Sequence, residues 1–251
     1  MRKAIGLVIL SCAAALAQVR AADSAPSGLR NGLFAGRPVE GRQFAAPPVA
    51  RYISEDGEAF VFDRSQGRPL LKFDANPEIW ALAPHPAPRG DIIYKNDLGA
   101  PVLRATRLGG VTVFTSTRPD GSAAALAGPG AAPLRLAPIG PVALAERIYQ
   151  ASTRASRAAR RTIPFFADNA TPGSSALISD AATVMAEAVV RIARRPDGAR
   201  LLARISKVVF VESRRAAASI DQGVVRIALA PEDGLAGRPS SERIVAVLAA
   251  N

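Results

Sequence analysis

Histidine and cysteine are almost absent from this chain of 251 residues, which contains one of each. Zinc sites take three or four ligands from His, Cys and carboxylate side chains, and Ser–His or Cys–His nucleophile pairs need a histidine beside the nucleophile. The single histidine, His85, stands in the proline-spaced segment "APHPAPRGD", which is typical of a solvated loop. The sequence therefore excludes His-based zinc sites and these nucleophile pairs, and we expect neither a metal site nor a cofactor.

The short motifs of common enzyme sites are also missing. The sequence contains no P-loop, no G-x-G-x-x-G, no G-x-S-x-G and no S-x-x-K motif. It does contain a carboxylate pair, Asp180 and Glu187, on one face of a predicted helix. Such a pair can serve acid–base catalysis, but no nucleophile accompanies it, and a solvated face with an i,i+4 pair between Glu187 and Arg191 is the simpler interpretation. We therefore predict no catalytic residues and expect a protein without enzymatic activity.

The N-terminus has the pattern of a signal peptide over residues 1–21. A basic start precedes the apolar run "AIGLVILSCAAALA", which is too short to span a bilayer comfortably, and small residues allow cleavage after Ala17 or Ala21. We therefore expect the mature protein to be periplasmic or secreted. Cys12 lies within this run in a poor lipobox context, so a lipoprotein is the alternative; cleavage beyond it leaves a mature chain without cysteine.

Composition divides the rest of the chain into four segments. Residues 22–48 form a Pro/Gly-rich lead-in, 49–116 a β domain, 117–140 a Pro/Gly/Ala linker and 141–251 an α+β domain. In the β domain, short runs rich in β-branched and aromatic residues alternate with turn signals such as "EDG", "SQGR" and "LGG". This alternation predicts an antiparallel meander, either a small sandwich or an open barrel.

Helices and strands are both predicted in the C-terminal half. The predicted elements are helices over 141–161, 171–195 and 199–205, strands over 207–213 and 223–230, and a terminal helix that begins near Ser241. The helix over 171–195 is apolar around much of its surface and is expected to be the most buried. The predicted fold class is therefore α+β: an N-terminal antiparallel β meander, then a helical region with a C-terminal β-hairpin and a terminal helix.

Positive charge is concentrated in one part of the chain. The formal net charge is +11, and 13 basic against 6 acidic residues lie between positions 141 and 215. The first predicted helix carries a stripe of arginines within roughly 80° of one another, at about 100° per residue. The stripe consists of Arg147, Arg154, Arg157 and Arg161.

An arginine stripe beside an apolar stripe is typical of a basic amphipathic helix. Such a helix suits an anionic membrane surface, a cell-wall polymer or an acidic protein. The export signal and an aromatic content of 5% argue against nucleic acid as the partner. The alternative is a solvated face in an arginine-rich composition. We predict a non-enzymatic binding or structural role in the bacterial envelope, and the sequence leaves the oligomeric state open.

The order of elements over residues 205–251 resembles one stretch of the secreted gluzincin-type zinc peptidases. A strand over 208–213 ends in Glu-Ser, a glycine opens a second strand over 223–229, and a "GL" loop and a helix over 241–249 follow. In that family the helix continues into a His-Glu-x-x-His motif, whereas this chain reads "AAN" there and ends. The resemblance therefore implies, as an alternative function, a degenerate zinc-peptidase-like module retained for binding or regulation, without catalysis.

A second resemblance covers most of the mature chain. It is carried by "GDIIYKNDLGAPVLRATRLGGVTVF" (90–114), "ASRAARR" (155–161) and "GLAGRPSSERIV" (234–245). These segments resemble a family of exported bacterial proteins that is defined as a domain of unknown function. The resemblance implies no particular activity.

Overall fold

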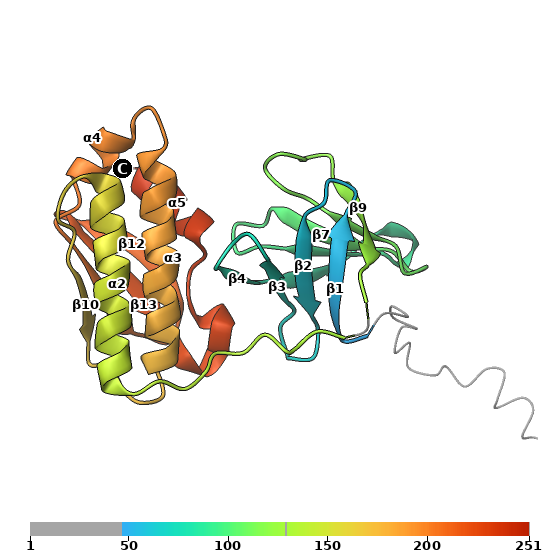
Figure 1. Ribbon diagram of the computed structural model, residues 1–251, viewed down its shortest axis with the longest axis horizontal. Helices are drawn as coiled ribbons and strands as arrows, with labels where there is room; N and C mark the ends of the chain where they lie inside the picture. The colour runs from blue at the N-terminus through green and yellow to red at the C-terminus, as the bar shows by residue number, and fades with distance from the viewer. Residues whose placement is uncertain (1–46, 129, 251) are drawn as a thin grey trace, which may run out of the picture. The chain divides into compact units, whose positions relative to one another are not determined.

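The protein is α+β, as predicted, with a nearly closed barrel of strands followed by helices, a small mixed sheet and a C-terminal helix (Figure 1). The computed structural model describes residues 47–128 and 130–250. The predicted signal peptide, Cys12 and nearly all of the predicted lead-in lie outside the described residues. Within the described part of the chain, no helix is both long and apolar enough to cross a membrane.

Over residues 47–128, the first sheet has nine strands, and every neighbouring pair in it is antiparallel. The strands are β1 (Val49–Ser54), β2 (Ala59–Asp63), β3 (Leu70–Phe73), β4 (Ile79–Ala81), β5 (Ala83–Pro86), β6 (Ile92–Lys95), β7 (Pro101–Ala105), β8 (Val111–Val113) and β9 (Ser122–Leu126). A short 3-10 helix, η1 (Pro88–Gly90), connects β5 to β6. The strand order is β4-β3-β2-β1-β9-β8-β7-β6-β5.

The sheet nearly closes because the chain from β4 to β5 connects its two ends. β4 pairs with β3, β5 pairs with β6, and Leu82 alone separates the two strands. Leu82 is fully buried, as is Phe60. The ring of Phe62 meets that of Tyr94 edge to face, with centroids 4.9 Å apart, and burial raises the pKa of Tyr94. These contacts fill the barrel with a packed hydrophobic core.

The strands of the barrel alternate between inward and outward side chains, as half-buried strands should. In β1, Ala50 and Tyr52 are buried while Arg51 and Ile53 are exposed. The turn to β2 contains Gly57 at a φ of 81°, a left-handed conformation that glycine adopts without steric cost. This alternation is the pattern from which the sequence predicts the meander.

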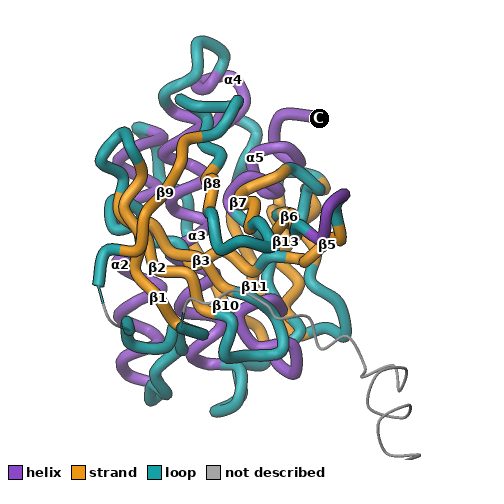
Figure 2. The backbone as a smooth tube through the Cα atoms, turned by 90° about the vertical axis from the view of Figure 1, so that its right-hand side faces the viewer, coloured by secondary structure: helices purple, strands orange, loops and turns teal. Residues whose placement is uncertain are grey.

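The last strand of the barrel, β9, lies inside the segment 117–140 that is predicted to be a linker. β9 pairs with β1 on one side and β8 on the other, so the barrel extends to Leu126 and its predicted limit at residue 116 is too early (Figure 2). The strand reads "SAAAL". Alanine has a low strand propensity, and pairing with β1 rather than local preference places this segment in the sheet.

Within the described residues, the second region contains four α-helices, one 3-10 helix and a four-stranded sheet. Its elements are α2 (Pro141–Ala159), β10 (Phe165–Asp168), α3 (Ser175–Ala193), α4 (Gly198–Ala203), β11 (Lys207–Glu212), β12 (Ala217–Asp221), β13 (Val224–Leu229), the 3-10 helix η2 (Pro231–Gly237) and α5 (Ser241–Ala250). The strand order is β10-β11-β13-β12, with the first three strands parallel and β12 antiparallel to β13. Proline at the first position of α2 starts that helix, as the sequence predicts.

Helix α3 is the centre of the second core, and its prediction as the most buried helix is confirmed. Ile178, Met185 and Ile192, spaced seven residues apart, are fully buried. Figure 1 shows α2 and α3 side by side across one face of the sheet. On that face Phe165 of β10 meets Phe210 of β11 with ring centroids 5.7 Å apart. α5 also packs on α3.

The C-terminal hairpin is present, but different strands form it from those recognised in the sequence. The strands predicted over 207–213 and 223–230 exist as β11 and β13, and they pair in parallel. The hairpin consists of β12 and β13, joined by Gln222 and Gly223 at φ values of 45° and 79°. Positive φ at both positions is typical of two-residue hairpin turns. β10 and β12 are short edge strands that the sequence pattern does not predict.

Candidate functional site

The four arginines of the predicted stripe lie on α2 or just after it, and all are exposed: Arg147, Arg154, Arg157 and Arg161. Two of them hold helices together. Arg154 pairs with Glu187 on α3, and Arg161 donates to two carbonyls at the end of α4. Within the described residues, the side chains of Arg147 and Arg157 have no hydrogen-bond or ion-pair partner. Two arginines of the stripe therefore contact other helices, and the other two extend into solvent.

A larger concentration of arginine forms where three helices end. The bonds from Arg161 bring the end of α2 to α4, and a short turn leads from α3 into α4, which lies at the upper ends of α2 and α3 in Figure 1. We call the seven arginines of residues 157–161 and 194–204 the basic end. They are Arg157, Arg160, Arg161, Arg194, Arg195, Arg200 and Arg204, and Asp197 is the one acidic residue in these two stretches.

Asp197 is paired within the basic end. Its carboxylate lies 2.9 Å from the Nε of Arg195 and 3.7 Å from a guanidinium nitrogen of Arg200. The hydrogen bond from Arg195 lowers the pKa of Asp197, and the charge of Arg200 adds to this effect. The aspartate therefore stays ionised and neutralises part of the charge of two arginines. Arg161 is bonded to α4, and the remaining four arginines of the basic end are exposed.

Helix ends explain how the fold accommodates this charge. Arg160, Arg194 and Arg204 are the C-cap residues of α2, α3 and α4. The last carbonyls of a helix carry a partial negative charge, which stabilises a nearby cation by about 0.3–1 kcal/mol. All three side chains are exposed, and within the described residues none has a hydrogen-bond or ion-pair partner. Their positive charge is therefore available to a ligand.

Most residues of the basic end are missed in the sequence because the pattern along one helix does not show where other helices end. Only Arg157 and Arg161 belong to both the predicted stripe and the basic end. A signal is nevertheless present, since the tripeptide "ARR" ends two helices, at 159–161 and at 193–195. The two tripeptides lie near each other only because α2 and α3 run in the same direction, which the sequence alone does not show.

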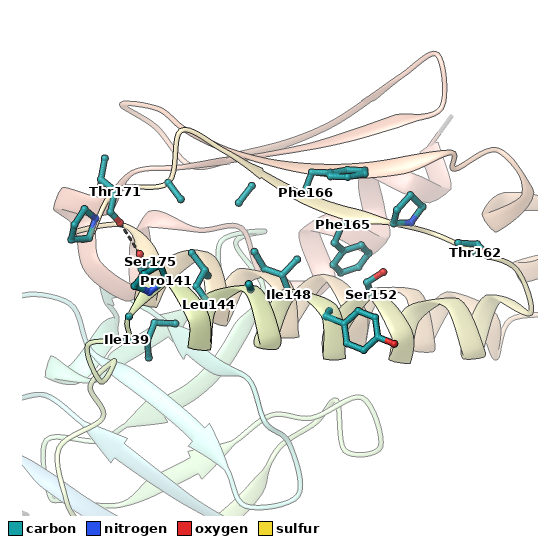
Figure 3. A pocket seen from close by; sticks show the side chains of 17 residues that line it. Ile139, Pro141, Leu144, Ile148, Ser152, Thr162, Phe165, Phe166, Thr171 and Ser175 are labelled. Atoms are coloured by element: carbon teal, nitrogen blue, oxygen red, sulfur yellow. Dashed lines mark hydrogen bonds between the residues drawn. The ribbon is translucent and has the colours of Figure 1, made fainter.

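A pocket of about 820 Å³ lies between α2 and the edge strand β10 (Figure 3). Leu144 and Ile148 on α2 and Phe165 on β10 contribute an apolar lining. Two hydroxyl groups that line the pocket are already bonded within the protein: Ser152 donates to a carbonyl at 2.9 Å and Ser175 to another at 2.8 Å. The pocket therefore presents mainly apolar surface and the edge of a strand.

One end of this pocket is fixed by a carboxylate. Glu212 accepts hydrogen bonds from the amide of Thr171 at 3.2 Å and from its hydroxyl at 2.9 Å. Hydrogen bonds from Ser174 and Thr171 lower the pKa of Glu212. An ionised Glu212 therefore ties the loop before α3 to the end of β11.

A buried arginine, Arg238, connects the C-terminal region to the barrel. Its side chain is 2% exposed and lies 3.5 Å from that of Glu78, which is 1% exposed. It also bonds to Asp180 on α3 and to the carbonyl of Ile79 at 2.7 Å. Ser241 donates its amide to Glu78 at 2.9 Å, so this carboxylate caps the start of α5. These contacts form one network between β4, α3 and α5.

The carboxylate pair identified in the sequence is separated into two ion pairs. Asp180 bonds to Arg238, and Glu187 pairs with Arg154 of the neighbouring helix. The predicted pair between Glu187 and Arg191 does not form, because Arg191 instead contacts the start of α5. Both carboxylates have structural roles. No group of three or more His, Cys, Asp or Glu side chains within the described residues is arranged to hold a metal ion.

Burial shifts the pKa of the Glu78 carboxyl group. Desolvation raises its pKa above the ordinary value, while the charge of Arg238 and the hydrogen bonds from Ser241 offset part of that effect. A raised folded-state pKa means that the native protein holds this proton more tightly than the unfolded chain. The ionisation of Glu78 therefore costs stability as the pH rises from the ordinary carboxyl range through the raised value.

We expect this cost to be visible in a Glu78→Gln variant, whose amide does not titrate. Over that pH window, the free energy of unfolding of the wild type should fall relative to the variant, with a slope of at most about 1.4 kcal/mol per pH unit. Denaturant titrations of both proteins from acidic to neutral pH measure this difference. A relative stability that instead rises with pH would show that Arg238 outweighs desolvation.

Residues 29–248 of the chain match the family model described as "Domain of unknown function (DUF4908)". No curated protein and no solved structure matches the chain. The geometry of the described residues therefore supplies the basis for a functional proposal.

Proposed function

The chain belongs to the DUF4908 family, and we propose that it is a non-enzymatic binding protein that attaches to an anionic surface of the bacterial envelope through its basic end. The observation that carries this proposal is the meeting of three helix ends, each capped by an exposed arginine. Guanidinium groups bind phosphate and carboxylate oxygens through paired hydrogen bonds. Closely spaced guanidinium groups therefore favour a ligand with closely spaced anionic groups.

An anionic lipid surface fits this arrangement well. Its phosphate groups are dense, and each basic residue close to such a surface contributes roughly 1 kcal/mol of binding free energy. The arginines of the basic end come from helix ends and from one connecting turn, so several of them can face one surface. The predicted export of the protein would bring it to envelope membranes, and this placement forms part of the proposal.

Reversing the charge of the basic end should abolish this attachment. We expect the triple variant Arg157→Glu, Arg160→Glu and Arg204→Glu to bind phosphatidylglycerol-containing vesicles at least about 100-fold more weakly than the wild type, because three contributions of roughly 1 kcal/mol are lost. None of the three side chains has a hydrogen-bond or ion-pair partner within the described residues. Vesicle co-sedimentation at low salt and at 0.5 M salt measures the effect.

A matched control changes the same net charge elsewhere. Arg68, Arg107 and Arg135 are exposed, and their side chains likewise have no hydrogen-bond or ion-pair partner within the described residues. Converting all three to glutamate should weaken binding far less than the first triple variant. Equal losses in both variants would reduce the proposal to an effect of net charge. Binding of the wild type that is absent, or that is insensitive to salt, would contradict it.

A second candidate is the degenerate zinc-peptidase-like module retained for binding or regulation. It is supported by the order of β11, β13 and α5, which matches the order of elements on which the resemblance rests, with β11 paired to β13 and α5 packed on α3. This candidate predicts a protein that holds no stoichiometric zinc after incubation with the metal and desalting. Elemental analysis of the purified protein measures zinc content, and one zinc per chain would contradict a non-catalytic module.

A further inference from the structure

Among the strands that the structure describes, β10 lies at the edge of its sheet, with β11 as its one neighbour. The amide of Val208 donates to the carbonyl of Pro164 at 2.9 Å, so Pro164 directs its polar group toward β11. Backbone polar groups alternate in direction along a strand, and hence those of Phe165 and Ala167 point away from β11. An unpaired edge of this kind is a template for another strand.

Exposed apolar side chains surround the same edge. Val142 and Tyr149 on α2 are 82% and 72% exposed, and Phe166 on β10 is 49% exposed. Tyr149 and Phe166 also line the apolar pocket between α2 and β10 (Figure 3). An occupant that supplies both backbone hydrogen bonds and apolar side chains would satisfy the strand edge and cover this surface.

We propose that the occupant is a second copy of this chain, whose β10 pairs with this β10 in antiparallel orientation about a two-fold axis at Phe166. In this register, Phe165 of the first copy lies opposite Ala167 of the second. The two-fold axis generates the equivalent pair between Ala167 of the first copy and Phe165 of the second. These are the residues whose backbone groups are free, so they form hydrogen-bonded pairs. The two Phe166 side chains then face each other as a non-hydrogen-bonded cross-strand pair, the closer of the two kinds.

Charge complementarity supports the antiparallel register. It places Asp168 of one copy opposite Pro164 of the other. Within each copy, Phe165 of β10 pairs with Val208 of β11. One residue earlier in the same register, Lys207 of β11 lies beside Pro164. Asp168 and Lys207 are exposed on the outer face of the sheet, and within the described residues neither side chain has an ion-pair partner. Two strand spacings, about 10 Å, separate their backbones across the interface, which both side chains together can span.

The helices fit the same symmetry. A two-fold axis that relates antiparallel strands of one continuous sheet is perpendicular to the sheet, so both copies of α2 lie on the same face, flanking the new pair of strands. The exposed Tyr149 of each copy is then on the side of α2 that faces the seam. The sheet becomes continuous across the two copies, and the apolar pocket becomes part of the covered interface.

The test is a charge exchange followed by sedimentation equilibrium of the full chain. We expect the wild type to dimerise, and we expect Asp168→Lys or Lys207→Asp alone to weaken dimerisation about tenfold or more, because each substitution acts at both symmetric sites. The double variant, which restores opposite charges, should recover most of the affinity. Ala167→Pro should also prevent dimerisation, since it removes an outward amide that β11 does not use.

Asp221→Lys on the opposite edge strand, β12, is the matched control and should leave the dimer unchanged. Thermal unfolding of each variant identifies any that fail to fold, and the charge exchange remains informative if Ala167→Pro is one of them. A wild type that is monomeric at all concentrations would overturn the proposal, as would a dimer that tolerates every substitution. Failure of the double variant to recover would overturn the register. A monomer whose β10 amides become protected from hydrogen exchange by an added apolar peptide would assign the edge to a peptide instead.

Discussion

The Arg238→Met variant is expected to lose about 3–5 kcal/mol of unfolding free energy, the cost of removing one partner from a buried ion pair. Methionine keeps most of the aliphatic volume of the arginine side chain. The loss of unfolding free energy therefore reflects the missing charge rather than a cavity. Without the guanidinium group, Glu78 stays almost fully buried beside Asp180, and within the described residues the donors of Ser241 are its remaining side-chain partners. Denaturant unfolding followed by circular dichroism measures the change.

Two comparisons make this prediction specific. The double variant Arg238→Met with Glu78→Leu removes both buried charges and should lose less than the sum of the two single variants, because it leaves fewer unpaired ions. Arg118, whose side chain is 63% exposed and pairs with Asp56, is the control. Arg118→Met should cost no more than about 1 kcal/mol. Equal losses at Arg238 and Arg118 would contradict the structural role of the buried network.

Gly237→Ala is expected to destabilise the protein by roughly 3 kcal/mol or more through overpacking. A Cβ atom at this position would lie 1.9 Å from the carbonyl oxygen of Ala230. The contact is between backbone segments, and the amide of Ala230 already donates to the carbonyl of Gly237 at 2.8 Å. The two backbone segments at the ends of η2 cannot separate without breaking that bond and displacing Arg238, the next residue. Thermal and denaturant unfolding measure the loss.

Gly67→Ala is the matched control for this substitution. A Cβ atom at Gly67 would meet nothing within 4 Å, and its φ does not lie in the left-handed region. Its effect should be smaller than about 1 kcal/mol in either direction. Equal stabilities of the two glycine variants would contradict the close approach of the Gly237 backbone to that of Ala230.

The sequence predicts most of the barrel and the two long helices because their signals are local. Alternation in β1 and the apolar surface of α3 are each visible in one short segment. β9 and β10 are not visible in this way. The alanines of β9 become a strand because β1 and β8 lie on either side, and β10 has only four residues, two of them consecutive phenylalanines. Pairing with other strands, rather than local sequence preference, therefore determines that these two segments form strands.

The candidate site is less predictable than the fold. The sequence identifies a basic segment and an amphipathic α2, but Arg154 proves to be a packing residue because Glu187 of α3 lies opposite it. Arg194 and Arg204 join the basic end only because the ends of three helices meet. Likewise, Glu78 and Arg238 are 160 residues apart, and no local pattern relates them. Contacts between distant segments determine both sites.

Amide hydrogen exchange with and without phosphatidylglycerol vesicles tests the proposed surface attachment most directly. We expect vesicles to slow exchange in residues 157–161 and 194–204, the two stretches of the basic end, and 0.5 M salt to remove this protection. Exchange in the barrel strands should be unchanged. Protection confined to the barrel, or no protection in either stretch at a vesicle concentration that binds the protein, would contradict the assignment of the basic end as the binding surface.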